Sequence, residues 1–365
     1  MSDYPTKLVE AFASQALRIF YMRSVSEAIT NRDYEGQVKD KSSILNVLTF
    51  GAISSKTYTG ADLTADELTE SNSQLVTDQL KAFYFKIKDY DTFRSYIKSP
   101  DGTILDQVAN ELKKVVDTFV LTLNGDVGAG NRDGTDYDTG TVTITVTTGA
   151  VVGSGTTFTT GMVGKGFKAL GHTAWYRVKT FTNTTNIVIQ DDSDDKTSAY
   201  SGGAISGGAT YTVQANTKLA VTKDTIFARC NELGMILTNR EIPMENRWLV
   251  IPARIANLVR QAPEYISAGT ESGRENVMNG ILSKKFCGFD IYEVSDDRID
   301  GDNTDGYNCI GGHKSAITFA MGMTENGIED LIGNFGKAYK SLHVYGAKVA
   351  DERRKALVEG FWYVA

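Results

Sequence analysis

Residues 126–212 are composed differently from the rest of the chain, and they constrain its fold more than any other segment. They hold nearly half of the chain's 35 glycines and alternate β-branched runs with turns. The runs are TVTITV, AWYRVKTF, TNIVIQ and ATYTV. Short strands between closely spaced turn signals predict a small all-β unit. Because helical periodicity precedes and follows this segment, we expect an α+β body that is interrupted by an all-β unit.

The stretch from Gly140 to Gly161, GTVTITVTTGAVVGSGTTFTTG, also invites comparison with loops that bind phosphate. A P-loop ends in Lys followed by Ser or Thr, and it leads from a strand into a helix. GSGTTFTTG lacks that ending, and in GMVGKGF the residue after Lys165 is a glycine. Both flanks have the pattern of strands, so the sequence argues against nucleotide binding here.

A charged, amphipathic segment directly before the β unit predicts the longest helix of the chain. After Pro100, Thr103 with Asp106 resembles a capping arrangement, and Asn124-Gly125 is a natural stop. Apolar residues recur at alternating spacings of three and four: Leu105, Val108, Leu112, Val115 and Phe119. A helix of about 20 residues is roughly 30 Å long, which is long for a compact domain and indicates a spine.

Two strand-like segments flank an acidic stretch earlier in the chain. Residues 44–58 are rich in apolar and β-branched side chains, residues 59–73 are acidic and polar, and residues 75–88 alternate again. In the last segment one face carries Phe83, Phe85 and Ile87, and the other carries Ala82, Tyr84, Lys86 and Lys88. We therefore expect an extended hairpin, which would bury little surface against itself and would need a partner.

The chain after residue 212 again combines helices with strands. One face of a predicted helix carries Ile226, Cys230, Leu233 and Leu237. WLVIP predicts a short buried strand, and ARIANLVRQ predicts a short helix. FDIYEVSD, SLHVYGAKV and FWYVA are expected to be strands, and ADERRKALVEG is compatible with a helix.

Residues that usually carry catalysis or bind metals are few and scattered. The three histidines, His172, His313 and His343, do not pair at metal-ligand spacing, and neither CxxC nor HExxH occurs. His313 in IGGHKSA could serve as a base or pack in a loop, and we favour packing because no nucleophile motif accompanies it. The acidic clusters at 191–196 and 296–306 could bind calcium weakly. Glycines at EF-hand ligand positions in the second cluster favour solvated turns for both.

Charge and cysteine content exclude further classes of protein. The net charge is −7 and the pI is near 5.2, so the chain as a whole lacks the basic footprint of a nucleic-acid-binding protein. Neither a signal pattern nor a membrane-length apolar run occurs, which predicts a protein made in a cytoplasm without a membrane partner. Cys230, Cys287 and Cys309 are an odd number, which fits reduced, buried thiols. We expect no catalytic residue, cofactor or metal.

The order of the expected elements resembles one known family. NRDYEGQVKD, LKAFYFKIKDYDTF, LDQVANELKKVVDTFVL and NELGMILTNREIPMENRWLVIPARIANLVR follow the order of arm, long hairpin, long helix and mixed lobe. With FCGFDIY, HKSAITFAMGM and HVYGAKV, this order resembles the major capsid proteins of tailed bacteriophages, which have the Hong Kong ninety-seven fold. The resemblance covers most of residues 20–125 and 215–365. Residues 130–213 look instead like a small β module found on phage structural proteins.

The resemblance implies an α+β capsid fold in five parts. The parts are an N-terminal arm (1–43), an extended E-loop hairpin with its exit (44–98), the spine helix with part of the P-domain (99–129), an inserted all-β domain (130–213) and an A-domain that returns to the P-domain (214–365). An arm and a long hairpin would give large contacts between subunits. Within the hairpin, the residues expected to contact other subunits are Phe83, Tyr84, Phe85, Lys86 and Ile87.

The resemblance also implies a function, that of a coat protein and not an enzyme. The chain would self-assemble into the icosahedral shell of a virion in the host cytoplasm, with the β domain on the outer surface. Expected partners are further copies in hexamers and pentamers, a separate scaffolding protein, a portal protein and packaged double-stranded DNA on the inner face. The alternative is a carbohydrate- or receptor-binding surface protein that uses Trp175 and Tyr176 of the β domain, and an unrecognised hydrolase comes third. The extended arm and hairpin argue against the binding protein, and the lack of concentrated catalytic motifs argues against the hydrolase.

Overall fold

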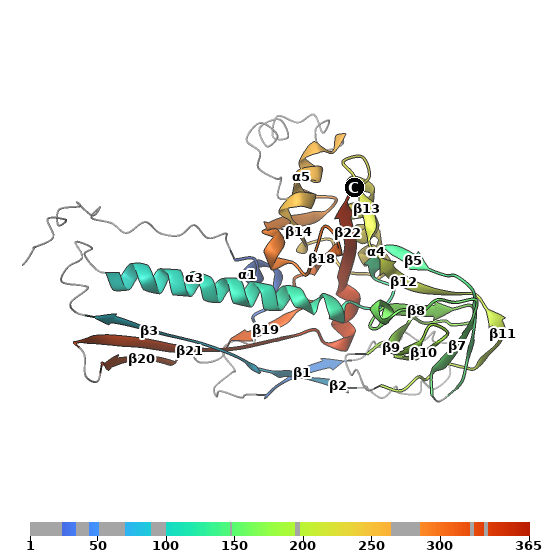
Figure 1. Ribbon diagram of the computed structural model, residues 1–365, viewed down its shortest axis with the longest axis horizontal. Helices are drawn as coiled ribbons and strands as arrows, with labels where there is room; N and C mark the ends of the chain where they lie inside the picture. The colour runs from blue at the N-terminus through green and yellow to red at the C-terminus, as the bar shows by residue number, and fades with distance from the viewer. Residues whose placement is uncertain are drawn as a thin grey trace, which may run out of the picture.

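The computed structural model describes residues 24–33, 44–50, 70–88, 100–146, 148–193, 198–263, 285–321, 325–331 and 335–365. These residues form four β-sheets arranged along one long helix, an α+β fold as expected (Figure 1). A narrow sheet lies beside one end of the helix, a mixed body surrounds the other end, and the all-β unit lies beyond the body.

The long helix α3 (Pro100–Leu121) is the expected spine, and it ends in a 3-10 turn, η2 (Thr122–Asp126). Its 22 residues span about 33 Å. The described part of the expected apolar stripe, from Val108 to Phe119, is half-buried. The fully buried apolar residues, Val116, Val120 and Leu121, lie in the last two turns. The spine is therefore anchored in the body by its C-terminal end.

An eight-stranded sheet forms the centre of the body. Its strand order is β13 (Leu219–Val221), β22 (Leu357–Val364), β18 (Gly306–His313), β14 (Arg247–Pro252), β16 (Phe289–Val294) and β15 (Lys285–Phe286), with β17 (Gly301–Asp302) on β18 and β4 (Arg132–Asp133) on β22. Helices α4 (Ile226–Asn239) and α5 (Ala253–Gln261) lie against it. The four predicted α4 residues, the WLVIP strand and the ARIANLVRQ helix are all confirmed.

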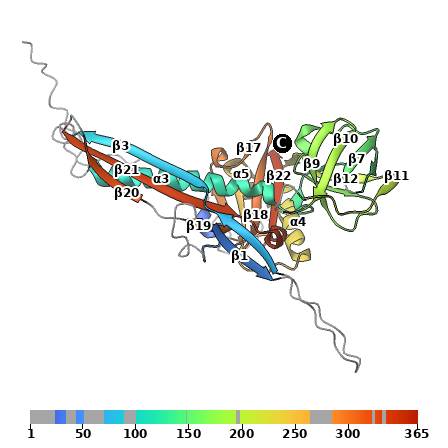
Figure 2. The same ribbon diagram turned by 90° about the horizontal axis from the view of Figure 1, so that it is seen from below.

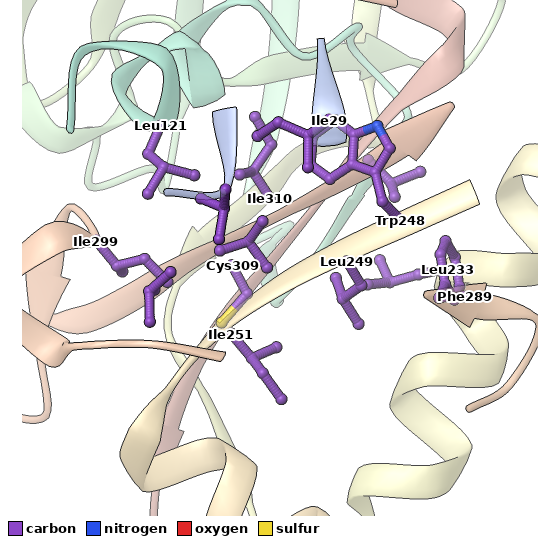
Figure 3. Packing of buried hydrophobic residues seen from close by; sticks show 14 of the residues in the cluster. Ile29, Leu121, Leu233, Trp248, Leu249, Ile251, Phe289, Ile299, Cys309 and Ile310 are labelled. Carbon is purple, nitrogen blue, oxygen red and sulfur yellow. The ribbon is translucent and has the colours of Figure 1, made fainter. Parts of the chain in front are cut away.

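The core of the body collects side chains from elements far apart in sequence. Figure 3 shows Leu233 of α4, Trp248, Leu249 and Ile251 of β14, Cys309 and Ile310 of β18, and Leu121 of α3 in one buried cluster. Ile29 of the short helix α1 (Ser26–Ile29) joins the same cluster. The chain before the spine and the chain after the β unit therefore share one hydrophobic core.

The α-helix with which ADERRKALVEG is compatible does not form. The segment begins as a 3-10 helix, η5 (Asp351–Ala356), and then continues as strand β22. Strand β22 pairs along β18 from Leu357↔Gly312 to Trp362↔Tyr307. Leu357 and Val358 are fully buried. Burial of an apolar run inside the sheet outweighs the helical propensity of the charged residues before it.

The expected hairpin of residues 44–58 with 75–88 is correct only in part. Strand β1 (Ile44–Phe50) pairs with β2 (Glu70–Val76), which places Ile44 opposite Val76. The chain then breaks at Thr77-Asp78, and the following strand β3 (Gln79–Lys88) does not continue the hairpin. The stretch 51–69 lies outside the described residues.

Strand β3 instead joins a separate sheet that runs along the spine. It pairs with β21 (Gly336–Lys348) from Gln79↔Tyr345 to Lys88↔Gly336. The other edge of β21 pairs with β19 (Thr318–Met321) and β20 (Glu325–Asp330). Figures 1 and 2 both place α3 over one face of this sheet. We call β3, β19, β20 and β21 the spine sheet.

Residues 135–217 form the predicted all-β unit. Its strand order is β11 (Ile205–Ala209), β6 (Thr141–Ile144), β7 (Ala150–Ser154), β10 (Asn186–Asp191), β9 (Tyr176–Asn183), β8 (Gly166–Ala169), β12 (Tyr211–Thr217) and β5 (Thr135–Tyr137). A short 3-10 turn, η3 (Thr160–Met162), precedes β8. The unit has a buried cluster of its own, which includes Phe158, Met162, Phe167 and Val213. The stretch Gly140–Gly161 contains the β6–β7 hairpin and the start of η3.

One buried carboxylate ties the spine to the chain before it and to the body. Asp117 of α3 accepts hydrogen bonds from the Ser24 hydroxyl (2.7 Å) and from the backbone N–H groups of Val25 (3.2 Å) and Ser26 (3.0 Å). It also pairs with the buried guanidinium of Arg298 at 3.0 Å, in the 3-10 turn η4 (Asp296–Arg298). Asp117 therefore accepts hydrogen bonds from the first N–H groups of α1 and also forms an ion pair with a buried cation.

We expect Asp117→Ala to lower the free energy of unfolding by about 3–5 kcal/mol, because the substitution removes a buried charge partner and leaves N–H groups of α1 without an acceptor. Urea unfolding followed by circular dichroism measures the change. Lys113→Ala, on the exposed face of the same helix, is the control and should change stability by less than about 0.5 kcal/mol. Equal effects of the two substitutions would contradict the role of Asp117.

Candidate interaction surfaces

The structure places the five residues expected to contact other subunits on strand β3. Phe83 and Phe85 are half-buried, with ring centroids 5.8 Å apart. Phe85 stacks on Tyr339 at 5.2 Å, and the two residues lie opposite each other in the β3–β21 ladder. Cross-strand aromatic pairs of this kind stabilise a sheet. These rings therefore stabilise strand pairing inside the subunit.

Tyr84 and Lys86 lie on the opposite face of β3 and are exposed, Tyr84 by 65%. The alternation of the strand puts Leu80, which is 57% exposed, on the same face as Tyr84. For Ile87 the structure describes the backbone, which pairs with Lys337. Of the five expected residues, Tyr84 and Lys86 thus have the exposure that an intermolecular contact requires.

Further exposed apolar side chains lie on the neighbouring extended strands and before β21. Ile44 of β1 and Val76 of β2 are 58% and 44% exposed, and they face each other across the hairpin. Figure 2 shows the β1–β2 hairpin extending the line of β3. At the other end of the spine sheet, Phe335 precedes β21 and is 88% exposed. We call Ile44, Val76, Leu80, Tyr84 and Phe335 the apolar row, and exposed large apolar side chains on or beside extended strands are candidates for contact with other molecules.

A polar junction holds the β unit against the end of the spine. The last turn of a helix leaves carbonyl groups without partners, and these groups favour a nearby cation. Arg177 of β9 donates to the carbonyl oxygens of Gly125 (2.8 Å) and Val127 (3.0 Å). Arg354 of η5 donates to that of Asp126 (2.9 Å).

Arg132 of β4 is the third arginine that donates hydrogen bonds to the carbonyl groups at the end of the spine. It donates to Asn124 O at 3.2 Å and forms an ion pair with the buried Glu359 of β22. We call Arg132, Arg177 and Arg354 the arginine junction, and all three are buried. Together they bind the backbone just after the spine from the β unit, the central sheet and η5.

Asp192 is the carboxylate that links two members of the arginine junction. Its Oδ1 accepts from Arg354 Nη2 at 2.6 Å and from Arg177 Nε at 3.1 Å, while its Oδ2 accepts from the Ala129 N–H at 2.6 Å. Burial lowers the pKa of Arg177, and the Asp192 charge opposes that change. Directional bonds to buried charges therefore fix the orientation of the β unit.

Sequence reasoning did not identify the arginine junction. Asp192 belongs to the acidic cluster 191–196, for which solvated turns were favoured, and for Asp192 that interpretation is wrong. Isolated arginines carry no local signal, because their partners are backbone carbonyl groups up to 228 positions away. The second cluster contains one such turn, in which Asp302 accepts the N–H groups of Thr304 and Asp305.

The histidines pack at separate places in the structure. His172 Nδ1 accepts the Ala169 N–H at 3.3 Å, so its Nε2 carries the proton that it donates to the Tyr200 hydroxyl at 2.8 Å. Tyr200 in turn donates to Gly203 O, and burial raises its pKa to about 12. His313 Nδ1 lies 2.8 Å from the Ser315 hydroxyl and accepts the Ser315 N–H within the same turn.

Metal-binding clusters and membrane-spanning helices are both absent from the described residues. No group of three or more His, Cys, Asp or Glu side chains in the described ranges has an arrangement that could hold a metal ion. Within the same ranges, no helix is both long and apolar enough to cross a membrane.

Comparison with known proteins gives a match in structure only. No family model and no curated protein matches the chain. A solved structure described as Mycobacterium phage Che8 aligns with a TM-score of 0.61 and 17% identity over 98% of both chains. The capsid structure of cyanophage P-SCSP1u gives 0.59 and 14% over 98% of this chain and 93% of that one. The capsid of cyanophage Pam1 gives 0.56 and 13% over 100% and 98%. The chain therefore has the fold found in phage capsid structures, as the sequence resemblance implied.

We expect Asp192→Ala to loosen the arginine junction. Backbone amide exchange at Ala129 should become faster, because its N–H loses the carboxylate acceptor, and stability should fall by about 2–4 kcal/mol. Hydrogen exchange read by mass spectrometry and urea unfolding measure the two effects. Asp138→Ala, an exposed carboxylate on the same β unit, is the matched control. Unchanged exchange at Ala129 would contradict the role of Asp192.

The half-buried ring of His172 predicts a loss of stability in acid. Burial, with a smaller contribution from Lys168, lowers the pKa of His172. The unfolded chain, with a histidine pKa of about 6.5, therefore binds the proton more readily. The stabilising effect of the neutral ring is complete above about pH 6.5 and is lost as the pH falls toward the lowered pKa.

His172→Gln should therefore reduce the fall in the thermal unfolding midpoint between about pH 7.5 and pH 5.5. Burial also lowers the pKa values of His313 and His343. These two residues should account for the pH dependence of stability that remains in the variant. Calorimetry at both pH values measures the difference between variant and wild type. An unchanged pH dependence in the variant would contradict the assignment.

Proposed function

We propose that the chain is a major capsid protein that self-assembles into the icosahedral shell of a tailed bacteriophage. The observation that carries the proposal is the fold match, which extends over 98–100% of the chain to phage capsid structures. The role is structural, since the function of such a subunit lies in its surfaces. The virion is its location, and the bacterial cytoplasm is the site of assembly.

The apolar row supports this proposal on physical grounds. A monomeric protein gains nothing from exposing large apolar side chains along extended strands, whereas a subunit that tiles a shell buries them against its neighbours. The spine sheet and the β1–β2 hairpin extend along one line in Figure 2. This thin, elongated part of the subunit offers a long contact surface to a neighbouring copy. Closed shells of hexamers and pentamers then require the same surfaces to repeat in every copy.

The five parts expected from the sequence remain our proposal for the organisation of the chain. The arm, the E-loop hairpin with its exit and the spine would make the overlapping contacts, and residues 214–365 the A-domain with its return. We propose that residues 130–213 are an insertion that faces outward, supported by the separate sheet and core of the β unit. A scaffolding protein, a portal protein and double-stranded DNA on the inner face are the proposed partners.

The alternative of a glycan- or receptor-binding protein receives no support from its proposed aromatic platform. Tyr176 is buried and contacts the His172 ring, and Trp175 is half-buried. Trp175 packs against Gly130, where a β-carbon would collide with the indole. Both rings therefore serve packing in the β unit and at its attachment to the body.

The test is electron microscopy of the expressed protein, with a scaffolding partner if assembly needs one. Closed shells with density for the β unit on the outside are the expected result. A persistent monomer or trimer that binds glycans would overturn the proposal in favour of the alternative. Density for the β unit on the inner wall would overturn the outward assignment alone.

Tyr84→Asp should block shell formation and leave the subunit folded, because Tyr84 is exposed and outside the aromatic stack. Tyr84→Phe keeps the ring and is the matched control, which should assemble. Phe85→Asp should instead lower the stability of the subunit as well as assembly, since Phe85 stacks on Tyr339 within the subunit. Electron microscopy counts shells, and urea unfolding measures stability. Normal assembly of Tyr84→Asp would contradict the role of the apolar row.

A further inference from the structure

Two of the three cysteines meet at the contact between α4 and the β15–β16 hairpin. Cys287 Sγ lies 3.7 Å from the carbonyl oxygen of Phe227, to which it donates a weak hydrogen bond. Phe227 is one helical turn before Cys230, so both face the same side of α4. Helical side chains lean over the preceding turn, so the Cys287 thiol at the Phe227 carbonyl group lies beside Cys230, whose pKa it raises. The sequence separation of the two residues gave no indication of this contact.

The backbone at Cys287 is unusual for a cysteine. Phe286 pairs with Phe289, so Cys287 and Gly288 are the two loop residues of a tight hairpin. Both have positive φ, 51° and 82°. Two-residue hairpins with this pattern favour Asn, Asp or Gly at the first position, because a side chain there strains the backbone. An outlier of this kind calls for a reason that lies in its side chain.

The surroundings hold Cys287 against the helix. The rings of Phe227 and Phe286 meet edge to face at 5.5 Å, which joins α4 to β15 directly beside the two thiols. A β-carbon at Gly234, one turn after Cys230, would come within 3.5 Å of the Cys287 carbonyl oxygen. Contacts at three successive turns of α4 therefore fix the position of the hairpin.

The two thiols differ in their exposure to solvent. Cys230 is fully buried, and the neighbouring Cys287 thiol together with burial raises its pKa well above the usual value. Cys287 is half-buried in the two-residue loop of the hairpin, which makes it the most accessible of the three cysteines. Cys309 is fully buried in β18, and burial raises its pKa as well. Only Cys287 has the access that a first reaction with solution requires.

We propose that Cys230 and Cys287 form a disulfide bond when the protein meets a small-molecule disulfide, and that this bond links α4 to the β15–β16 hairpin. The Cys287 thiolate attacks one sulfur of the reagent, forms a mixed disulfide and releases one thiol. Cys230 then attacks Cys287 Sγ, its proton passes to the second departing thiolate, and a second thiol is released. The two cysteines lose two electrons, and the reagent disulfide gains them.

The bond closes a loop of the chain between residues 230 and 287 and so restricts the unfolded state. A reducing cytoplasm keeps the pair as thiols, whereas oxidising surroundings outside a cell favour the bond. The inference depends on the cysteine geometry and holds whether or not the chain forms a shell. It adds a modification site on the body, away from the apolar row.

The experiment uses the full chain, folded and reduced, with oxidised glutathione as the probe. After quenching in acid, remaining thiols are alkylated in denaturant, and a non-reducing digest is read by mass spectrometry. The expected product has alkylated Cys309 and a peptide pair linked through Cys230 and Cys287, and its urea midpoint rises relative to the reduced protein. Glutathione retained on Cys287, full alkylation of all three cysteines, or a link to Cys309 would each overturn the proposal.

Matched variants separate the proposed pair from the third cysteine. Cys309→Ser should still form the link, since Cys309 takes no part in it. Cys287→Ser should form none and should keep Cys230 alkylatable. Cys230→Ala fills the buried site without a polar atom and should leave Cys287 as a stable mixed disulfide with glutathione. Formation of the internal link in either of the last two variants would place the bond elsewhere and overturn the assignment.

Discussion

The carbonyl groups at the end of the spine helix set the main constraint on this structure. Arg132, Arg177 and Arg354 bind them from three different parts of the chain, and Asp192 links two of these arginines. Buried guanidinium groups need partners in fixed directions, because an unpaired charge inside a protein is costly. The spine, the β unit and the central sheet are therefore held in one arrangement at a single point.

A second buried charge does the same for the chain before the spine. Asp117 joins α1 and Arg298 to α3, about two helical turns before the first carbonyl group of the arginine junction. The C-terminal half of the spine is thus fixed on two sides, while its N-terminal half lies over the spine sheet (Figure 1). This division gives a rigid body with an extended sheet attached. For a shell subunit, the rigid part would set the geometry, and the exposed apolar row would meet the neighbours.

Sequence periodicity predicted the individual elements well and their partners less well. The spine, α4, α5 and the strands of the β unit follow from local patterns, since a helix or strand face repeats at short intervals. The partner of β3 does not follow, because alternation shows which residues share a face and says nothing about the strand alongside. β21 lies about 250 residues later in the chain. Local patterns therefore predicted the β1–β2 hairpin but not the strand that pairs with β3.

The sequence by itself determined that an all-β segment interrupts the helical patterns, that a long helix precedes it, and that the order of elements resembles that of phage capsid subunits. Those properties depend on local composition and spacing. Only the tertiary structure decided that Phe85 stacks within the subunit while Tyr84 stays exposed, that three arginines meet at the spine, and that Cys230 lies beside Cys287. Each of these depends on contacts between residues distant in sequence, and such contacts form only when the whole chain has folded.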